Sequence, residues 1–164
     1  MYLITPHTLA LLPHYSIDHQ TKVLETNQSI LCKEPPLQLI KLNCLIGGSS
    51  YDGRKEAMTY HFGFKQRIPI AIFPQQNLYF FPTKSPEAPD CIWLSLANIR
   101  FIKRHENKTN VQFHNGYILT LEQSLYTVRK QHERAGMCKL MYEMGMMRNQ
   151  TELYAEKGVS TYNY

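Results

Sequence analysis

Short runs of apolar and β-branched residues, separated by turn residues, dominate residues 1–121 and predict a succession of β-strands. Two of the runs, Thr21–Thr26 and Ser29–Lys33, flank Asn27-Gln28 and predict a hairpin. Pro69 cannot donate a backbone hydrogen bond, so Ile68–Phe73 is expected to be an edge strand or to mark the start of a strand. The other predicted strands are Thr8–Leu12, Leu37–Ile46, Thr59–Phe64 and Leu78–Phe81, and Cys91–Leu94 carries Trp93, which is expected in the core.

The strongest β signal is a three-stranded meander near the middle of the chain. Asn115-Gly116 is typical of a type I′ turn, in which both central residues have φ > 0. The expected strands are Ile99–His105, Thr109–Phe113 and Ile118–Leu121.

A proline-free segment follows, in which good helix formers dominate. It predicts a helix from Ser124, a suitable N-cap, to about Arg148. Its apolar face is expected to pack on the sheet, and a subunit interface is the alternative. That face comprises Met137, Leu140, Met141, Met144 and Met147.

Many strands followed by one long helix predict an α+β fold with a mainly antiparallel sheet. Residues 1–148 are expected to form a single domain. Gln150–Tyr164 is polar and lacks a helical period, so residues 149–164 are predicted to be a mobile C-terminal tail.

The composition narrows the class of protein. The chain has 164 residues, of which 43% are hydrophobic, and it contains no apolar run of about 18 residues and no signal-peptide pattern. We therefore expect a cytoplasmic protein without a membrane span. The four cysteines are widely separated and the seven histidines are scattered, so neither a metal site nor a cofactor is predicted.

The positive charge is concentrated in one part of the chain. The formal net charge is +5, and residues 100–148 hold nine Lys or Arg against four Asp or Glu. A localised basic excess suits a polyanionic partner, although a soluble surface has the same pattern. The cations nearest the first turn of the meander are Arg100, Lys103, Arg104 and Lys108.

The Gly47–Lys55 segment is a glycine-rich loop followed by two cations. Glycine, serine and aspartate favour turns. Backbone N–H groups next to Arg54 and Lys55 suit an anion, most readily a phosphate, and a solvated turn is the equally weighted alternative. The spacing differs from that of a Walker loop.

No constellation of residues predicts an enzyme. Cys91 lacks a supporting motif, His105 and His114 lack carboxylate partners, and no pair of acidic residues stands out for acid–base chemistry. An unrecognised hydrolase that uses Cys91 or a histidine is the minor alternative.

Four ordered segments resemble one family, the bacterial competence transcription factor ComK. Gly48–Lys55 is similar to its Gly-Ser-Ser-Tyr-x-Gly-Arg-Lys segment, and Phe81-Pro82-Thr83 to its Phe-Pro-Thr element. The pattern Pro89-x-Cys91-x-Trp93-x-Ser95 and the hairpin Val111-x-Phe113-x-Asn115-Gly116 also match. The resemblance covers roughly residues 8–134.

The resemblance implies a DNA-binding transcription activator of DNA-uptake genes. Its partners would be AT-rich double-stranded DNA, bound mainly through the minor groove, and further copies of the chain in a dimer or tetramer. RNA polymerase and a protease adaptor are further implied partners, and the protein would be nucleoid-associated. In this family the C-terminal region contributes to assembly and to adaptor capture; Leu153-Tyr154 is the candidate remnant here, although the chain departs from the family beyond about residue 135.

The predicted DNA-binding residues form two groups. The motif supplies Ser49, Ser50, Tyr51, Arg54 and Lys55, and the charge pattern supplies Arg100, Lys103, Arg104 and Lys108. The alternative to DNA binding is a regulatory or interaction paralogue that pairs with a full-length competence factor.

Overall fold

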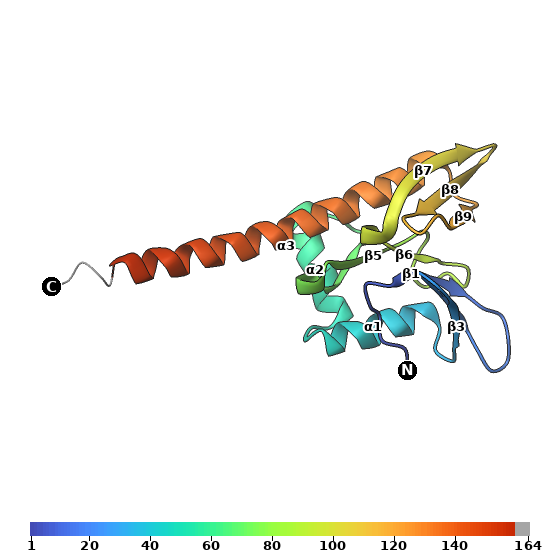
Figure 1. Cartoon of the computed structure of the whole chain (residues 1–164), viewed down its shortest axis with the longest axis horizontal. Coiled ribbons are helices and arrows are strands. Elements are labelled where there is room, and N and C mark those ends of the chain that lie inside the picture. The colour runs from blue at the N-terminus through green and yellow to red at the C-terminus, as the bar shows by residue number, and fades with distance from the viewer. Residues whose placement is uncertain (160–164) are drawn as a thin grey trace.

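The computed structural model describes the backbone of residues 1–159. The side chains of residues 146–147, 149–150, 153–154 and 156–159 lie outside this description, as do residues 160–164. Met147 and Leu153-Tyr154 therefore fall outside the described side chains. Figure 1 shows a body of two sheets and two shorter helices, beyond which the long helix α3 (Leu125–Val159) projects. This arrangement confirms the α+β prediction.

The larger sheet has six strands in the order β3-β2-β1-β6-β5-β4, and all neighbours are antiparallel. Its β4 strand lies at an edge, as Pro69 predicts. The strands are β1 (Thr8–Pro13), β2 (Thr21–Glu25), β3 (Ser29–Cys32), β4 (Ile70–Phe73), β5 (Leu78–Pro82) and β6 (Trp93–Ser95). The 3₁₀ turns η1 (Pro74–Gln76) and η2 (Leu96–Asn98) follow β4 and β6.

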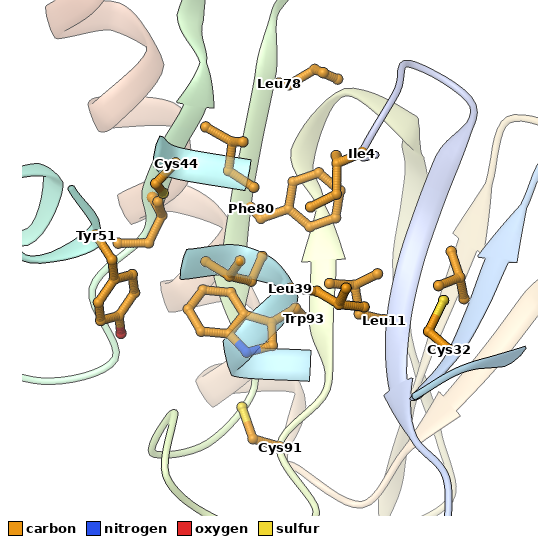
Figure 2. Packing of buried hydrophobic residues seen from close by; sticks show 14 residues of the cluster. Ile4, Leu11, Cys32, Leu39, Cys44, Tyr51, Leu78, Phe80, Cys91 and Trp93 are labelled. Atoms are coloured by element: carbon orange, nitrogen blue, oxygen red, sulfur yellow. The ribbon is translucent and has the colours of Figure 1, made fainter. Parts of the chain in front are cut away.

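The two faces of this sheet carry separate cores because side chains alternate along each strand. On one face Leu11, Phe80 and Trp93 pack against the helix α1 (Pro36–Ile46), as Figure 2 shows. On the other face Ala10, Leu94 and Phe81 pack against the smaller sheet and α3. Trp93 is fully buried, which confirms its predicted place in the core. The sheet is therefore the middle of three layers.

The structure corrects the prediction of a strand at Leu37–Ile46, because α1 occupies this segment. Pro36 at the first helical turn is pre-organised for a helix. The buried residues follow helical spacing, whereas the alternation that suggested a strand mixes buried and exposed positions. The buried set is Pro36, Leu39, Ile40, Asn43 and Cys44.

A second helix, α2 (Tyr51–Phe62), replaces the predicted loop at 51–55 and the predicted strand Thr59–Phe64. Ser50 is its N-cap, and its hydroxyl accepts a hydrogen bond from the Gly53 N–H at 2.9 Å. Gly63 ends the helix in the left-handed conformation, with φ 69°. The alternating aromatic residues that suggested a strand do not share one buried face. Tyr60 is exposed on the helix, and Phe64 is buried but lies beyond the end of the helix.

The smaller sheet is the predicted meander of β7 (Ile99–His105), β8 (Lys108–Phe113) and β9 (Ile118–Leu121). Its second turn differs from the type I′ prediction. The Gly116 N–H donates to the Phe113 carbonyl at 3.0 Å, and only Gly116, at φ 89°, has a positive φ there. A type I turn followed by a glycine bulge has this pattern.

The helix α3 begins as predicted, since the Ser124 hydroxyl accepts the Thr127 N–H at 3.2 Å. Among its described residues, the buried hydrophobic side chains that pack on the body are Val128, Ala135 and Cys138. The predicted packing of the methionine face on the sheet is wrong for three positions, because Met137, Leu140 and Met144 are exposed and only Met141 is partly buried. The helix also continues to Val159, beyond its predicted end near Arg148, whereas a mobile tail stays a prediction.

Asn43 connects α1 to the N-terminal segment, and its removal should destabilise the fold. Its buried amide accepts the Ile4 N–H at 2.8 Å and donates to the Tyr2 carbonyl at 3.1 Å. Asn43→Ala leaves these buried groups unpaired, so we expect the free energy of unfolding in urea to fall by about 2 kcal/mol. Asn107→Ala, at an exposed site in the β7–β8 turn, is the control and should change it by less than about 0.5 kcal/mol. Equal stability of the two variants would contradict this role.

Candidate nucleic-acid interface

Five backbone donors of the glycine-rich segment form hydrogen bonds within the chain. The N–H groups of Gly47, Gly48 and Ser49 donate to carbonyls in the last turn of α1 at 3.0–3.1 Å. Those of Gly53 and Arg54 donate to the Ser50 hydroxyl and carbonyl. Ser49 and Ser50 thus connect and cap helices, and phosphate binding by this segment stays a prediction.

Tyr51 is the deepest member of the motif. Its side chain is only 5% exposed, and its ring meets Trp93 edge-on at a centroid distance of 6.5 Å (Figure 2). Two lysines flank the ring, with Lys55 Nζ at 4.7 Å and Lys41 Nζ at 5.7 Å from its centroid. Burial raises the pKa of Tyr51, so the hydroxyl is a hydrogen-bond donor at neutral pH.

Arg54 points toward α3 and is half-buried. Its Nη1 donates to the Tyr142 hydroxyl at 3.1 Å, and its guanidinium lies 5.5 Å from the centroid of the Tyr142 ring. Its Nη2 lies 3.5 Å from the Gly47 carbonyl oxygen. The side chain therefore joins the end of α1 to α3. The neighbouring Lys55 turns outward and pairs with Asp52 at 3.0 Å.

The second predicted group lies on β7. Arg100, Lys103 and Arg104 are exposed, whereas Lys108 on β8 pairs with Glu122 at 2.8 Å. Phe101, which is 43% exposed, lies between two of these cations: its ring centroid is 5.1 Å from the Arg100 guanidinium and 4.8 Å from Lys103 Nζ. An aromatic side chain is thus presented to solvent with a cation on either side.

The structure adds cations on α3 that the motif did not reveal. Arg129 Nη2 lies 3.5 Å from the Ile102 carbonyl oxygen, and Arg129 and Arg100 line one shallow hollow of about 330 Å³. On the other side of α3, Lys130 and Arg67 line a hollow of about 270 Å³. We call Arg100, Arg129, Lys130 and Arg67 the basic band. In the sequence, the charge excess of residues 100–148 included Arg100, Arg129 and Lys130, whereas no sequence signal indicated Arg67.

Other site chemistry is not evident in the described part of the chain. Among the residues searched, no group of three or more His, Cys, Asp or Glu side chains could hold a metal ion. None of the described helices combines the length and the apolar character that a membrane span requires. All four cysteines are buried free thiols, and burial raises the pKa of Cys44 to about 11 and that of Cys138 to about 12.

Comparison with known proteins assigns the family. The family model described as ComK protein matches residues 1–147. This chain belongs to the ComK family. It is 29% identical over 145 residues to the competence transcription factor of Bacillus subtilis (strain 168), a match that covers 87% of this chain and 75% of that relative. No solved structure matches the chain.

Arg54 offers a test of how the ComK motif is used. Because its guanidinium packs on Tyr142, Arg54→Ala should lower the free energy of unfolding in urea by about 1–2 kcal/mol. Arg54→Lys keeps the charge but loses the planar contact, so it should be destabilised nearly as much. Lys55→Ala, which removes an exposed ion pair, is the control and should cost less than about 1 kcal/mol.

The same variants should also be titrated with a labelled AT-rich duplex. Full stability of Arg54→Ala together with a loss of duplex affinity would show that Arg54 contacts DNA directly and does not act as a structural residue.

Proposed function

We propose that this chain is a transcription activator of competence genes that binds AT-rich DNA through the β7–β8 hairpin and the basic band. The exposed Phe101 between Arg100 and Lys103 is the observation that carries the proposal. Membership of the ComK family and the similarity to the Bacillus subtilis competence transcription factor support it. RNA polymerase, a protease adaptor and nucleoid association remain predictions.

The hairpin has the features that a minor-groove contact requires. The minor groove of A-tracts is narrow and strongly negative, and it attracts arginine and lysine. Proteins that bind there also insert apolar side chains between base steps, which bends the duplex. Phe101 supplies such a side chain, and the hairpin lies at the end of the body opposite the tip of α3 (Figure 1). Arg129 then lies beside the hairpin on α3, and Lys130 lies on the other side of this helix; both suit phosphate contacts.

The proposed activator is a dimer built on the outer half of α3. An apolar groove of about 470 Å³ lies between the end of α2 and α3, where Phe62, Met141 and Met144 are among its lining residues. Leu140 and Met144 are 56% and 60% exposed. Exposed apolar residues that gather on one helix face mark interaction sites, and methionine adapts well to such contacts. A second copy would cover this face, and pairing of such dimers would give a tetramer.

The DNA contact can be tested by fluorescence anisotropy with an AT-rich and a GC-rich duplex at several salt concentrations. Arg100→Ala and Lys103→Ala should each weaken binding to both duplexes and reduce the salt slope by about 1, because each removes one phosphate contact. Phe101→Ala should mainly reduce the preference for the AT-rich duplex. Lys33→Ala, at an exposed lysine after β3, is the control and should bind normally.

Unchanged binding by all three β7 variants would remove this hairpin from the interface. Absence of duplex binding by the native chain, together with co-purification of a longer relative, would favour the interaction paralogue.

The dimer can be tested by light scattering. Leu140→Glu and Met144→Glu place a charge on the exposed apolar face, so each should shift the protein to the monomer without unfolding it. Tyr126→Glu, at an exposed position near the start of α3, is the control and should remain a dimer. Met141 is a poor probe because it packs on the body. A monomeric native chain, or dimeric Leu140→Glu and Met144→Glu variants with normal circular dichroism, would contradict this interface.

A further inference from the structure

A separate pocket lies where four distant segments meet. The start of α2, the loop before β4, the loop after β5 and the start of α3 enclose about 590 Å³. This volume lies within the range of small-molecule sites. Its charged lining consists of Lys55, Lys65, Arg67, Lys84 and Glu87.

The charge balance of this pocket favours an anion. Lys55 pairs with Asp52, and Lys84 pairs with Asp90. Neither Lys65 nor Arg67 forms a salt bridge within the described residues, and both are exposed. These two cations are therefore available to a ligand, and they outnumber the one lining carboxylate, Glu87.

The Arg67 backbone is held in an unfavourable conformation. Its φ is 49°, in the left-handed region that residues with a Cβ rarely adopt. The buried Gln131 holds it, because Gln131 Nε2 donates to the Arg67 carbonyl at 2.7 Å. Arg134 Nη1 also donates to the neighbouring Gln66 carbonyl at 3.1 Å. Such strain is retained where the surrounding structure fixes it, and it commonly marks binding sites.

Gln131 also fixes the opposite wall. Its Nε2 lies 3.2 Å from the Pro82 carbonyl oxygen, at the end of the strand that leads into the Lys84 loop. One buried amide thus sets the positions of both the Arg67 and the Lys84 segments. Tyr51, whose ring packs on Trp93 of the sheet, also lines the pocket. In Figure 2 its hydroxyl points away from Cys44. The backbone segments that carry Arg67 and Lys84 are therefore fixed before any ligand binds, which lowers the entropy lost on binding.

We propose that this pocket binds a phosphate group through Lys65 and Arg67, with Lys55, Lys84 and the Tyr51 hydroxyl as further donors. Arginine and lysine form charge-assisted hydrogen bonds to phosphate oxygens, and the fork of Arg67 suits two of them. Two sources carry this chemistry: a free phosphorylated small molecule, or a phosphate of the DNA backbone. The site itself does not depend on the proposed DNA contact at β7.

The direct test is calorimetric titration of the full chain with inorganic pyrophosphate at constant ionic strength. The native chain should bind it, and Lys65→Ala should bind at least tenfold more weakly. Arg67→Asn should behave likewise, since asparagine tolerates the left-handed backbone and only the cation is lost. Lys33→Ala, an exposed lysine beyond β3 at the far edge of the sheet, is the control and should bind as the native chain does. No binding by the native chain, or equal binding by Arg67→Asn, would overturn the site.

Duplex titrations of Lys65→Ala separate the two sources, because Lys65 lines the pocket and lies outside the basic band, whereas Arg67 belongs to both. A parallel tenfold loss of duplex affinity, with pyrophosphate competing for the duplex, would assign the site to the DNA backbone. Normal duplex affinity with lost pyrophosphate binding would assign it to a small phosphorylated ligand. If the native chain does not bind pyrophosphate, the β7 variants should still weaken duplex binding. If the β7 variants bind the duplex normally, the native chain should still bind pyrophosphate.

Discussion

The contact between Tyr51 and Trp93 is the constraint on which the arrangement of the functional surfaces depends. Trp93 is fully buried on β6, one of the middle strands of the six-stranded sheet. The Tyr51 ring packs against it in the core that the sheet shares with α1. This contact fixes where α2 begins, and the start of α2 sets the direction of each motif side chain that follows. Arg54 consequently meets Tyr142 on α3, while Lys55 lines the pocket for which phosphate binding is proposed. One buried aromatic pair thus relates the sheet, α3 and a charged surface.

The strands were predictable to the extent that their signals are local. Asn115-Gly116 and Pro69 act through backbone restrictions of their own residues, so the meander and the edge strand were found from sequence. The helices α1 and α2 were missed because a short apolar run fits either period. In α1 the two adjacent buried pairs, Leu39-Ile40 and Asn43-Cys44, separate the helix from a strand, and their burial is decided by the sheet against which the helix packs. Ser50 is a good N-cap and could have predicted the start of α2. The neighbouring glycines favoured a loop instead.

The functional surfaces were less predictable than the fold, for a physical reason. A motif identifies residue types in order, whereas the direction of a side chain depends on partners that lie far away in the chain. Arg54 is directed by Tyr142, which lies on the last helix, and the phosphate pocket needs four segments to meet. Arg67 carries no motif and gives no sequence signal, because its left-handed backbone is imposed by Gln131. Arg100 and Lys103 were candidates because a local charge excess is visible in the sequence itself, and β7 leaves both side chains exposed.

The helix α3 changes its environment along its length, and this change relates the proposed activities. Its first turns carry Arg129 and Lys130 beside β7 and Arg67, while Val128 and Ala135 anchor them to the body. Its next turns expose Leu140 and Met144 beyond the sheet. DNA and a second copy would therefore bind to separate parts of one rigid helix and would not compete. Because both parts belong to a continuous helix, a dimer formed on the outer turns would fix the separation of its two hairpins. Such a dimer would favour duplexes whose two AT-rich boxes match that separation, so spacing between boxes would contribute to selectivity along with the sequence of each box.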